Sequence, residues 1–266
     1  MRLRWSVVVL MAMVAAVAHA QAPTTTSVQA GGGPIVVTAL GHGSVQIEQG
    51  NKVVIVDPVS GMADLSRAKR ADLILVTDIH QDHLDAAAVA KLRKPGAPVV
   101  VPQAVADMKQ IPDVTVMTNR TMRTNETALA GMTVISVPAY NIQRGPSPGQ
   151  FYHTRERGQG YYVAFTDQLA VVRQKKAGSV YVAGDTECVP AIAQWVKDVD
   201  VALLPMNLPY TMTPVEAAEC AKGFRPKVAI PYHYMGQKPE EFAAALKGGM
   251  IEVRLLNFYA KAGGTQ

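Results

Sequence analysis

The chain has 266 residues, of which 48% are apolar, 18% charged and 6% aromatic, and its 21 Gly and 17 Pro are close to ordinary usage. This composition excludes a collagen-like, low-complexity or disordered chain, and the length suffices for one large domain with a buried core. The formal net charge is +5, and removing Arg2 and Arg4, which lie in the leader described next, leaves +3. Such a small, scattered charge does not indicate a nucleic-acid or membrane-surface protein.

The first 20 residues have the three parts of a secretory signal. Arg2 and Arg4 form a basic start, Val7–Ala18 is an apolar run, and Ala18-His19-Ala20 is a small-x-small cleavage site. A membrane anchor is the alternative, but a spanning helix needs about 20 apolar residues and this run is shorter. No Cys follows the site, so a lipid anchor is not expected. We expect a signal peptide over residues 1–20, cleavage after Ala20, and a periplasmic or secreted mature protein.

Residues 21–33 are rich in Thr, Ala, Gln and Gly and predict a flexible lead-in, followed by a single domain over residues 34–266. Short apolar runs bounded by turn residues predict strands at Ile35–Leu40, Ser44–Gln49, Val53–Val56, Leu73–Thr77, Val99–Val101, Met132–Val137, Tyr161–Phe165, Val180–Ala183, Val201–Leu204, Val228–Ile230 and Val253–Leu255. This order indicates antiparallel hairpins first and then alternating strands and helices.

Three helices are expected between these strands. The first is capped by Asp85 and runs to about Leu92. The second is opened by the capping box Thr213-Pro214-Val215-Glu216, with Pro at the first helical position, and the third runs from about Pro239 to Leu246.

The chain has two cysteines, Cys188 and Cys220. In an oxidising compartment they could form one disulfide, and two small buried apolar residues are an equally acceptable interpretation.

The histidines carry the most functional information. Of the six, His19 belongs to the leader, and most of the others stand beside Gly, Asp or Pro directly after an apolar run. His80-Gln81-Asp82-His83 follows the expected strand Leu73–Thr77 and places two imidazoles and a carboxylate on one tight loop. These are the ligand types that Zn, Mn and Fe take, so the loop predicts a metal site, whereas a solvated turn before the helix is the alternative.

The segment Asp78-Ile79-His80-Gln81-Asp82-His83 resembles the His-x-His-x-Asp-His signature of the metallo-β-lactamase superfamily, with Asp in place of the first His. Further segments resemble that family's landmarks in their order, namely Gly41-His42-Gly43-Ser44, Val56-Asp57-Pro58, Val137-Pro138-Ala139-Tyr140-Asn141, Ala183-Gly184-Asp185-Thr186 and Ile230-Pro231-Tyr232-His233. The resemblance covers about Leu40 to His233. It implies an α/β fold, the four-layer αββα sandwich, with a metal site along one edge of its two sheets.

Two further segments, Phe151-Tyr152-His153 and Pro205-Met206-Asn207, resemble the branch that contains ascorbate-6-phosphate lactonase and N-acyl-phosphatidylethanolamine phospholipase D. Fold alone does not give a substrate.

The resemblance also implies a ligand set. Asp82, His83 and His233 match one metal position, Asp185 matches the carboxylate that bridges both, and the other position falls to Asp78, His80 and Asn141. This second position is richer in oxygen than three imidazoles, which suits Mn²⁺ or Fe²⁺ as well as Zn²⁺. One or two divalent ions are therefore expected, and a single ion is the alternative because Asn is a poor ligand.

The chemistry implied is metal-dependent hydrolysis of an ester, lactone or phosphodiester bond in a small molecule, with Asp82 or Asp185 orienting a metal-activated water. Supporting or substrate-binding roles are expected for His42, Asp57, His153 and Asn207.

The loop Arg144–Gly160, with Arg144, Arg155 and Arg157, is interpreted either as a cover that binds an anionic substrate group or as a solvated loop. A non-catalytic metal- or ligand-binding protein remains an alternative function, and a β-lactamase is disfavoured by the loss of the first and third His. We expect no nucleic-acid partner and no membrane contact after cleavage, and no residue pattern indicates an oligomeric state.

Overall fold

The structure is a computed structural model that describes residues 22–118, 126–168, 174 and 176–260. It contains two seven-stranded sheets packed face to face. The first sheet contains, in spatial order, β1 (Thr25–Ala30), β2 (Gly33–Gly41), β3 (Ser44–Gln49), β4 (Lys52–Val56), β5 (Leu73–Leu75), β6 (Val99–Pro102) and β7 (Thr115–Met117). The second contains β14 (Glu252–Val253), β13 (Val228–Tyr232), β12 (Val201–Pro205), β11 (Ser179–Val182), β10 (Gly158–Ala164), β9 (Met132–Ala139) and β8 (Glu126–Leu129).

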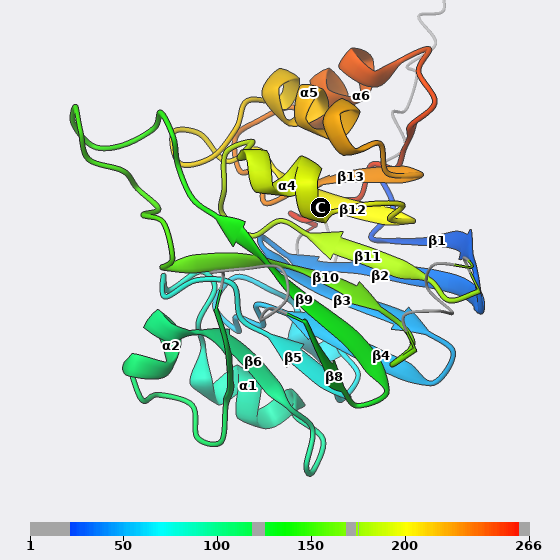
Figure 1. The fold of residues 1–266 in the computed structure, drawn as a ribbon, viewed down its shortest axis with the longest axis vertical. Coiled ribbons are helices and arrows are strands. Elements are labelled where there is room, and N and C mark those ends of the chain that lie inside the picture. Colours follow the sequence, from blue (N-terminus) through cyan, green and yellow to red (C-terminus); the bar gives the residue numbers. More distant parts are fainter. Residues whose placement is uncertain (1–21, 119–125, 169–173, 175, 261–266) are drawn as a thin grey trace, which may run out of the picture.

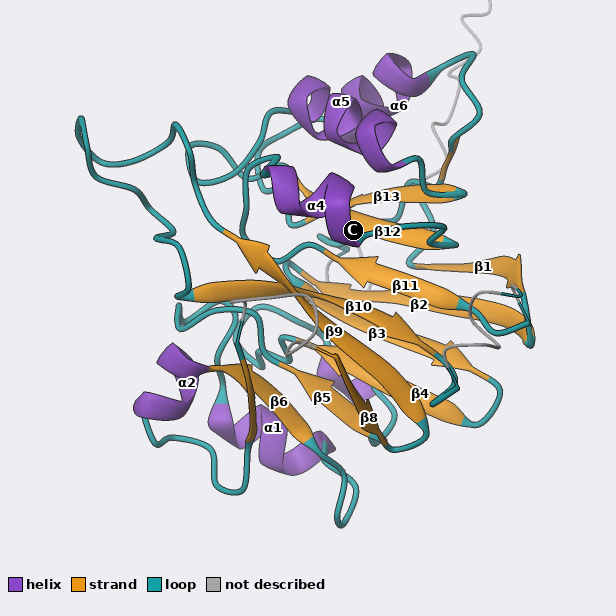
Figure 2. Cartoon of the chain, viewed as in Figure 1, coloured by secondary structure: helices purple, strands orange, loops and turns teal. Residues whose placement is uncertain are grey.

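Helices cover the outer face of each sheet (Figure 1, Figure 2). On the first sheet these are α1 (Ala86–Leu92) and α2 (Gln103–Asp107), and on the second α4 (Pro190–Trp195), α5 (Pro214–Phe224) and α6 (Pro239–Leu246), with a short 3-10 turn η1 at Leu65–Arg67. The αββα sandwich expected from the sequence is therefore present.

The two halves of the chain repeat one strand arrangement. In the first sheet β1 to β4 are antiparallel, and β4 to β7 are parallel. In the second sheet β8 to β11 are antiparallel, and β11 to β14 are parallel. The expected order of hairpins followed by alternating strands and helices thus holds within each half.

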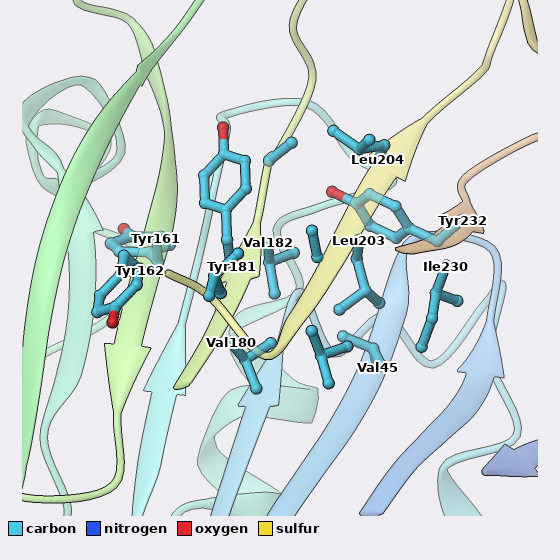
Figure 3. Close-up of a cluster of buried hydrophobic side chains, with 14 of the residues drawn as sticks. Val45, Tyr161, Tyr162, Val180, Tyr181, Val182, Leu203, Leu204, Ile230 and Tyr232 are labelled. Carbon is cyan, nitrogen blue, oxygen red and sulfur yellow. The ribbon is translucent and has the colours of Figure 1, made fainter. Parts of the chain in front are cut away.

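The main core fills the space between the sheets. Val45 of the first sheet meets Val180, Leu203 and Ile230 of the second within one buried cluster (Figure 3). A smaller cluster lies between the outer face of the first sheet and α1, with Ile74 among its buried members. The parallel strands β5, β6, β12 and β13 are buried along their whole length and are continuous apolar runs in the sequence, whereas β1 and β2 have alternating or partly exposed side chains.

The expected helix starts are confirmed. The Asp85 side chain accepts a hydrogen bond from the Ala88 amide at the start of α1, and Thr213 and Glu216 form the reciprocal capping box of α5. Cys188 and Cys220 form a disulfide with their Cα atoms 5.5 Å apart, which ties the segment after Asp185 to α5.

The expected flexible lead-in is corrected. Residues 25–30 form β1, which pairs with β2 from Thr25 opposite Thr38 to Ala30 opposite Gly33. Backbone pairing at a sheet edge orders this polar segment. The expected signal peptide, residues 1–20, lies outside the described residues. Within the described part of the chain, no helix is long and apolar enough to cross a membrane.

Candidate metal centre

The predicted ligands come together at one edge of the sandwich because they follow strands whose carboxyl ends meet there. Asp78, His80, Asp82 and His83 occupy the connection between β5 and α1, Asp185 follows β11, and His233 follows β13. Their side-chain donor atoms form two groups that share the Asp185 carboxylate, and we name these groups the Asp82 half-site and the Asp78 half-site.

The Asp82 half-site contains Asp82, His83 and His233. The Nε2 atoms of the two imidazoles lie 3.3 Å apart, and His233 Nε2 is 3.3 Å from Asp82 Oδ2. Asp185 completes the group, with its Oδ2 3.4 Å from His83 Nε2 and its Oδ1 3.6 Å from His233 Nε2. Both imidazoles are buried, so nitrogens and carboxylates converge on one point inside the protein.

The Asp78 half-site contains Asp78, His80 and His153. Asp78 Oδ2 lies 3.5 Å from His80 Nδ1 and 3.7 Å from His153 Nε2. The same nitrogen, His153 Nε2, also lies 3.2 Å from Asp185 Oδ2. Asp185 therefore lies between the two half-sites, as the sequence predicts for a bridging carboxylate.

The donor set fits divalent metal. Asp78 Oδ2 and Asp185 Oδ1 are buried without a hydrogen-bond partner. A buried carboxylate oxygen without a partner is costly, and a cation held by carboxylates and imidazoles removes that cost. Each half-site offers two imidazole nitrogens besides carboxylate oxygens, a donor set that suits Zn²⁺, Fe²⁺ and Mn²⁺.

The expected roles of Asn141 and His153 are corrected. Asn141 Oδ1 accepts a hydrogen bond from the His153 amide at 2.7 Å and lies 2.9 Å from His153 Nδ1, and Asn141 Nδ2 donates to the Tyr210 carbonyl at 2.8 Å. Both ends of the amide are thus engaged, and Asn141 is not placed as a ligand. It instead orients His153, whose Nε2 occupies the position expected of Asn141. The backbone bond from Asn141 N to His153 O, at 2.9 Å, closes the loop that brings the two together.

Asp57 supports His83 as expected. Its Oδ2 lies 2.8 Å from His83 Nδ1, and its Oδ1 accepts the Thr77 amide at 2.7 Å. The hydrogen bond to Nδ1 leaves His83 Nε2 directed into the half-site, a common arrangement behind metal-binding imidazoles. The supporting role expected for Asp57 is therefore consistent with the geometry.

His42 also contacts the Asp82 half-site. Its Nε2 lies 3.1 Å from Asp82 Oδ2, and its Nδ1 lies 3.1 Å from the Tyr259 hydroxyl. The next residue must be small, since a Cβ on Gly43 would lie 3.0 Å from His233 Cδ2. Sequence reasoning missed Tyr259, which comes from the end of the chain and carries no motif.

Electrostatics favour the ionised forms of Asp82 and Asp185 and a protonated His83 in the metal-free cluster. Burial opposes a charge on His83, but the Asp185 and Asp57 carboxylates outweigh it and raise its pKa well above the usual value. Burial likewise works against a charged Asp185, yet His233 and His83 hold the pKa of this carboxyl well below its usual range. The pKa of Asp82 is lowered against its burial by hydrogen bonds to His233 and His42.

The sequence leaves the Arg144–Gly160 loop as either an anion-binding cover or a solvated loop, and in the structure its three arginines have protein partners. Arg144 donates to Glu187 and Glu216, each at 2.6 Å, and the Arg155 guanidinium lies 5.5 Å from the Tyr140 ring centroid. Arg157 turns inward, with its Nε 3.5 Å from Asp78 Oδ1 and its Nη2 3.4 Å from His80 Nε2, and it donates to the Tyr152 carbonyl. The carboxylate partners Glu187, Glu216 and Asp78 have no sequence signature, because they are far from the arginines along the chain.

A cavity of about 640 Å³ opens onto both half-sites. It is lined by His42, Met62, His80, Gln81, Asp82, Tyr152, His153, Asp185, Asn207, Tyr210, Met235 and Tyr259. Asn207 thus faces the cavity, consistent with the expected substrate contact, and its Oδ1 is buried without a partner. The arrangement provides two metal positions beside a space for a small molecule.

Known proteins are similar to this chain in sequence and in fold. Residues 36–233 match the beta-lactamase superfamily domain. A UPF0173 metal-dependent hydrolase of Thermococcus kodakarensis is 32% identical over 232 residues, which cover 83% of this chain and 95% of that protein. A solved structure of a candidate metal-dependent hydrolase from Parabacteroides distasonis has a TM-score of 0.74 and 35% identity, covering 87% of this chain and 97% of its own. A metallo hydrolase from Ignicoccus hospitalis has the same fold, with a TM-score of 0.64, 23% identity, and coverage of 84% of this chain and 94% of its own. The family match and the two half-sites together show that the chain belongs to the beta-lactamase superfamily and is a metal-dependent hydrolase.

Proposed function

We propose that the protein binds two divalent metal ions, one in each half-site, and hydrolyses an ester, lactone or phosphodiester bond of a small molecule. The observation that carries this proposal is the convergence of the imidazoles and carboxylates of the two half-sites beside the cavity, with Asp78 Oδ2 and Asp185 Oδ1 buried without a hydrogen-bond partner. We propose Zn²⁺ as the resident ion, with Fe²⁺ and Mn²⁺ as the alternatives that the same donor set accepts.

When bound, divalent metal would supply a Lewis acid that polarises the scissile group and lowers the pKa of water. His83, His233, Asp82 and Asp185 would hold one ion, and Asp78, His80, His153 and Asp185 the other. Asp185, with a side chain only 4% exposed, would contribute to both positions. Asp82 is the more exposed of the two carboxylates that line the cavity, with 26% of its side chain exposed.

We therefore propose Asp82, rather than Asp185, as the carboxylate that would orient the attacking water. His42 hydrogen bonds to Asp82 Oδ2, and Tyr259 hydrogen bonds to His42, which together fix the rotamer of Asp82. Asn207 lies on the cavity wall, where its amide can bind a substrate oxygen or nitrogen.

We further propose that the protein acts after export. The leader-like residues 1–20 support this, and so does the Cys188–Cys220 disulfide, since disulfides persist mainly in oxidising compartments. Amino-terminal sequencing of the mature protein from fractionated cells tests it. A start at Gln21 in the periplasm or medium is expected, and an intact leader on protein held in the cytoplasm would contradict it.

Turnover of p-nitrophenyl acetate and bis-p-nitrophenyl phosphate by metal-loaded protein tests the activity. We expect hydrolysis of at least one of them, quenched by a chelator and lost in Asp82→Ala. Asp107→Ala is the control, because Asp107 is an exposed carboxylate on α2 that does not line the cavity. Full metal loading without any turnover would favour the non-catalytic alternative, and selective hydrolysis of a chromogenic cephalosporin would favour a β-lactamase.

A further inference from the structure

Large exposed apolar side chains gather at the mouth of the cavity. Met62 and Met235, on its wall, have 49% and 54% of their surface exposed, and Tyr210 and Tyr259 on the same wall are also exposed. Ile142 and Phe151, two further exposed apolar residues, belong to the loop that carries the wall residue Tyr152. Single exposed apolar residues need no explanation, but a cluster around a functional cavity marks a binding surface.

The charged groups on the cavity wall also favour an apolar binding partner. The described residues that line it include no lysine or arginine, and its formal charges are the metal-ligating carboxylates Asp82 and Asp185 with the neighbouring histidines. The nearest loop cations already have partners, since Arg144 pairs with Glu187 and Glu216. Arg157 lies beside His80 and pairs with Asp78, and it is not among the residues that line the cavity. A remote anionic group of a substrate would therefore meet apolar side chains and no compensating cation.

From these two observations we propose that the substrate carries an uncharged, apolar acyl or alkyl substituent of several carbons, which packs against Met62, Met235 and Tyr210 while the scissile bond faces the half-sites. The proposal rests on the hydrolytic function proposed above and names its substrate class. Unbranched methionine side chains adapt their shape to an apolar partner, so this wall would accept chains of different lengths.

A matched series of p-nitrophenyl esters tests the proposal. The series runs from acetate through butyrate and hexanoate to octanoate, and mono-p-nitrophenyl suberate serves as the equally long ester that ends in a carboxylate. Because a fully buried methylene is worth about fourfold in binding, we expect kcat/KM to rise by about twofold to fourfold per methylene until the cavity is filled. The suberate ester should be at least about tenfold poorer than the octanoate ester.

Substitutions on the cavity wall test which residues cause the dependence of turnover on chain length. Met62→Gln and Met235→Gln should each reduce the ratio of octanoate to acetate turnover by about threefold or more, with little change for acetate. Met250→Gln is the matched control, because Met250 is 88% exposed and lines a different cavity beside α6 and β14. A flat chain-length profile, or equal turnover of the suberate ester, would overturn the proposal while leaving the hydrolytic function intact.

A binding measurement separates the two proposals if no ester is hydrolysed. Calorimetric titration of metal-loaded protein with octanamide and with suberamate, its carboxylate-ended analogue, needs no turnover. Tighter binding of octanamide, weakened in Met235→Gln, would support the apolar substrate class even though ester hydrolysis had failed. Equal binding, or no binding of either amide, would overturn it.

Discussion

The two half-sites offer similar donor atoms but differ in what surrounds them. In the Asp82 half-site both imidazoles are buried, His83 is held by Asp57, and Asp82 is held by His42. In the Asp78 half-site the His80 side chain is 42% exposed, and the Arg157 guanidinium lies 3.5 Å from the ligand carboxylate. Donor identity alone therefore does not set metal affinity, because support and nearby charge also act on it. We expect the Asp82 half-site to fill first and to hold its ion more tightly.

The largest expected effect comes from removing a ligand of the tighter half-site. His233→Ala should lower kcat/KM by about a thousandfold or more, since it removes an ion and the water activation that this ion supplies. His80→Ala should cost less, because its half-site is the weaker one. Steady-state kinetics at saturating metal measure both, and a larger loss in His80→Ala would reverse the ranking of the half-sites.

Acid should weaken metal binding by the next largest amount. The raised pKa of His83 means that metal-free protein holds a proton on this residue at neutral pH. That proton stabilises the metal-free fold below the unfolded pKa of about 6.5, and the stabilisation is lost as pH rises through the folded value. Metal must displace the proton, so affinity should fall about tenfold per pH unit below the folded pKa.

Competition with a chelator between pH 8 and pH 6 measures this dependence. Asp57→Asn removes one of the two carboxylates that raise the pKa of His83, so its profile should be shallower. A pH-independent affinity in the wild type, with no proton release on binding, would contradict the assignment of His83 as a ligand.

Loss of the support behind His153 should affect the Asp78 half-site alone. Asn141→Ala removes both hydrogen bonds that orient His153, which should weaken this half-site about 10-fold to 100-fold and leave the Asp82 half-site unchanged. The control is Gln143→Ala, a loop neighbour with an exposed side chain. Equal weakening of both half-sites would mean that Asn141 has a general structural role.

The smallest effect should come from the cation beside Asp78. Arg157→Gln removes the positive charge that lies beside the Asp78 carboxylate. The metal affinity of the Asp78 half-site should therefore rise by about threefold to tenfold. Arg155→Gln is the control, since Arg155 lies over Tyr140 instead. Titration with Co²⁺, followed by its visible spectrum, reports the affinity, and weaker binding in Arg157→Gln would show that the arginine organises the site.

The expected ligands that the structure brings together share one property. Asp78, His80, Asp82, Asp185 and His233 all follow apolar strands, where strand direction determines the edge at which they emerge. His153 lies 12 residues beyond Asn141 in the loop between β9 and β10, which folds back to place it against Asn141. Pattern and spacing carry no information about such a closure, so the resemblance gives the third ligand position to Asn141.

Two other features depended on tertiary contacts. Residues 25–30 were predicted as lead-in because they are polar, yet pairing with β2 orders them at the sheet edge. The charge of the loop arginines leaves an anion-binding cover and a solvated loop as alternatives, whereas the structure pairs Arg144 with Glu187 and Glu216, and Arg157 with Asp78. In each case a partner distant in sequence decides the outcome, whereas the sandwich itself follows from the order of strands and turns.

Stepwise calorimetric titration of metal-free wild-type protein with Zn²⁺, beside His153→Ala, tests whether each half-site binds one ion. We expect two binding steps of different affinity in the wild type, with only the weaker one lost in His153→Ala. A single step that His153→Ala leaves unchanged would contradict the second metal position, and the Asp78 half-site would then be part of the substrate pocket.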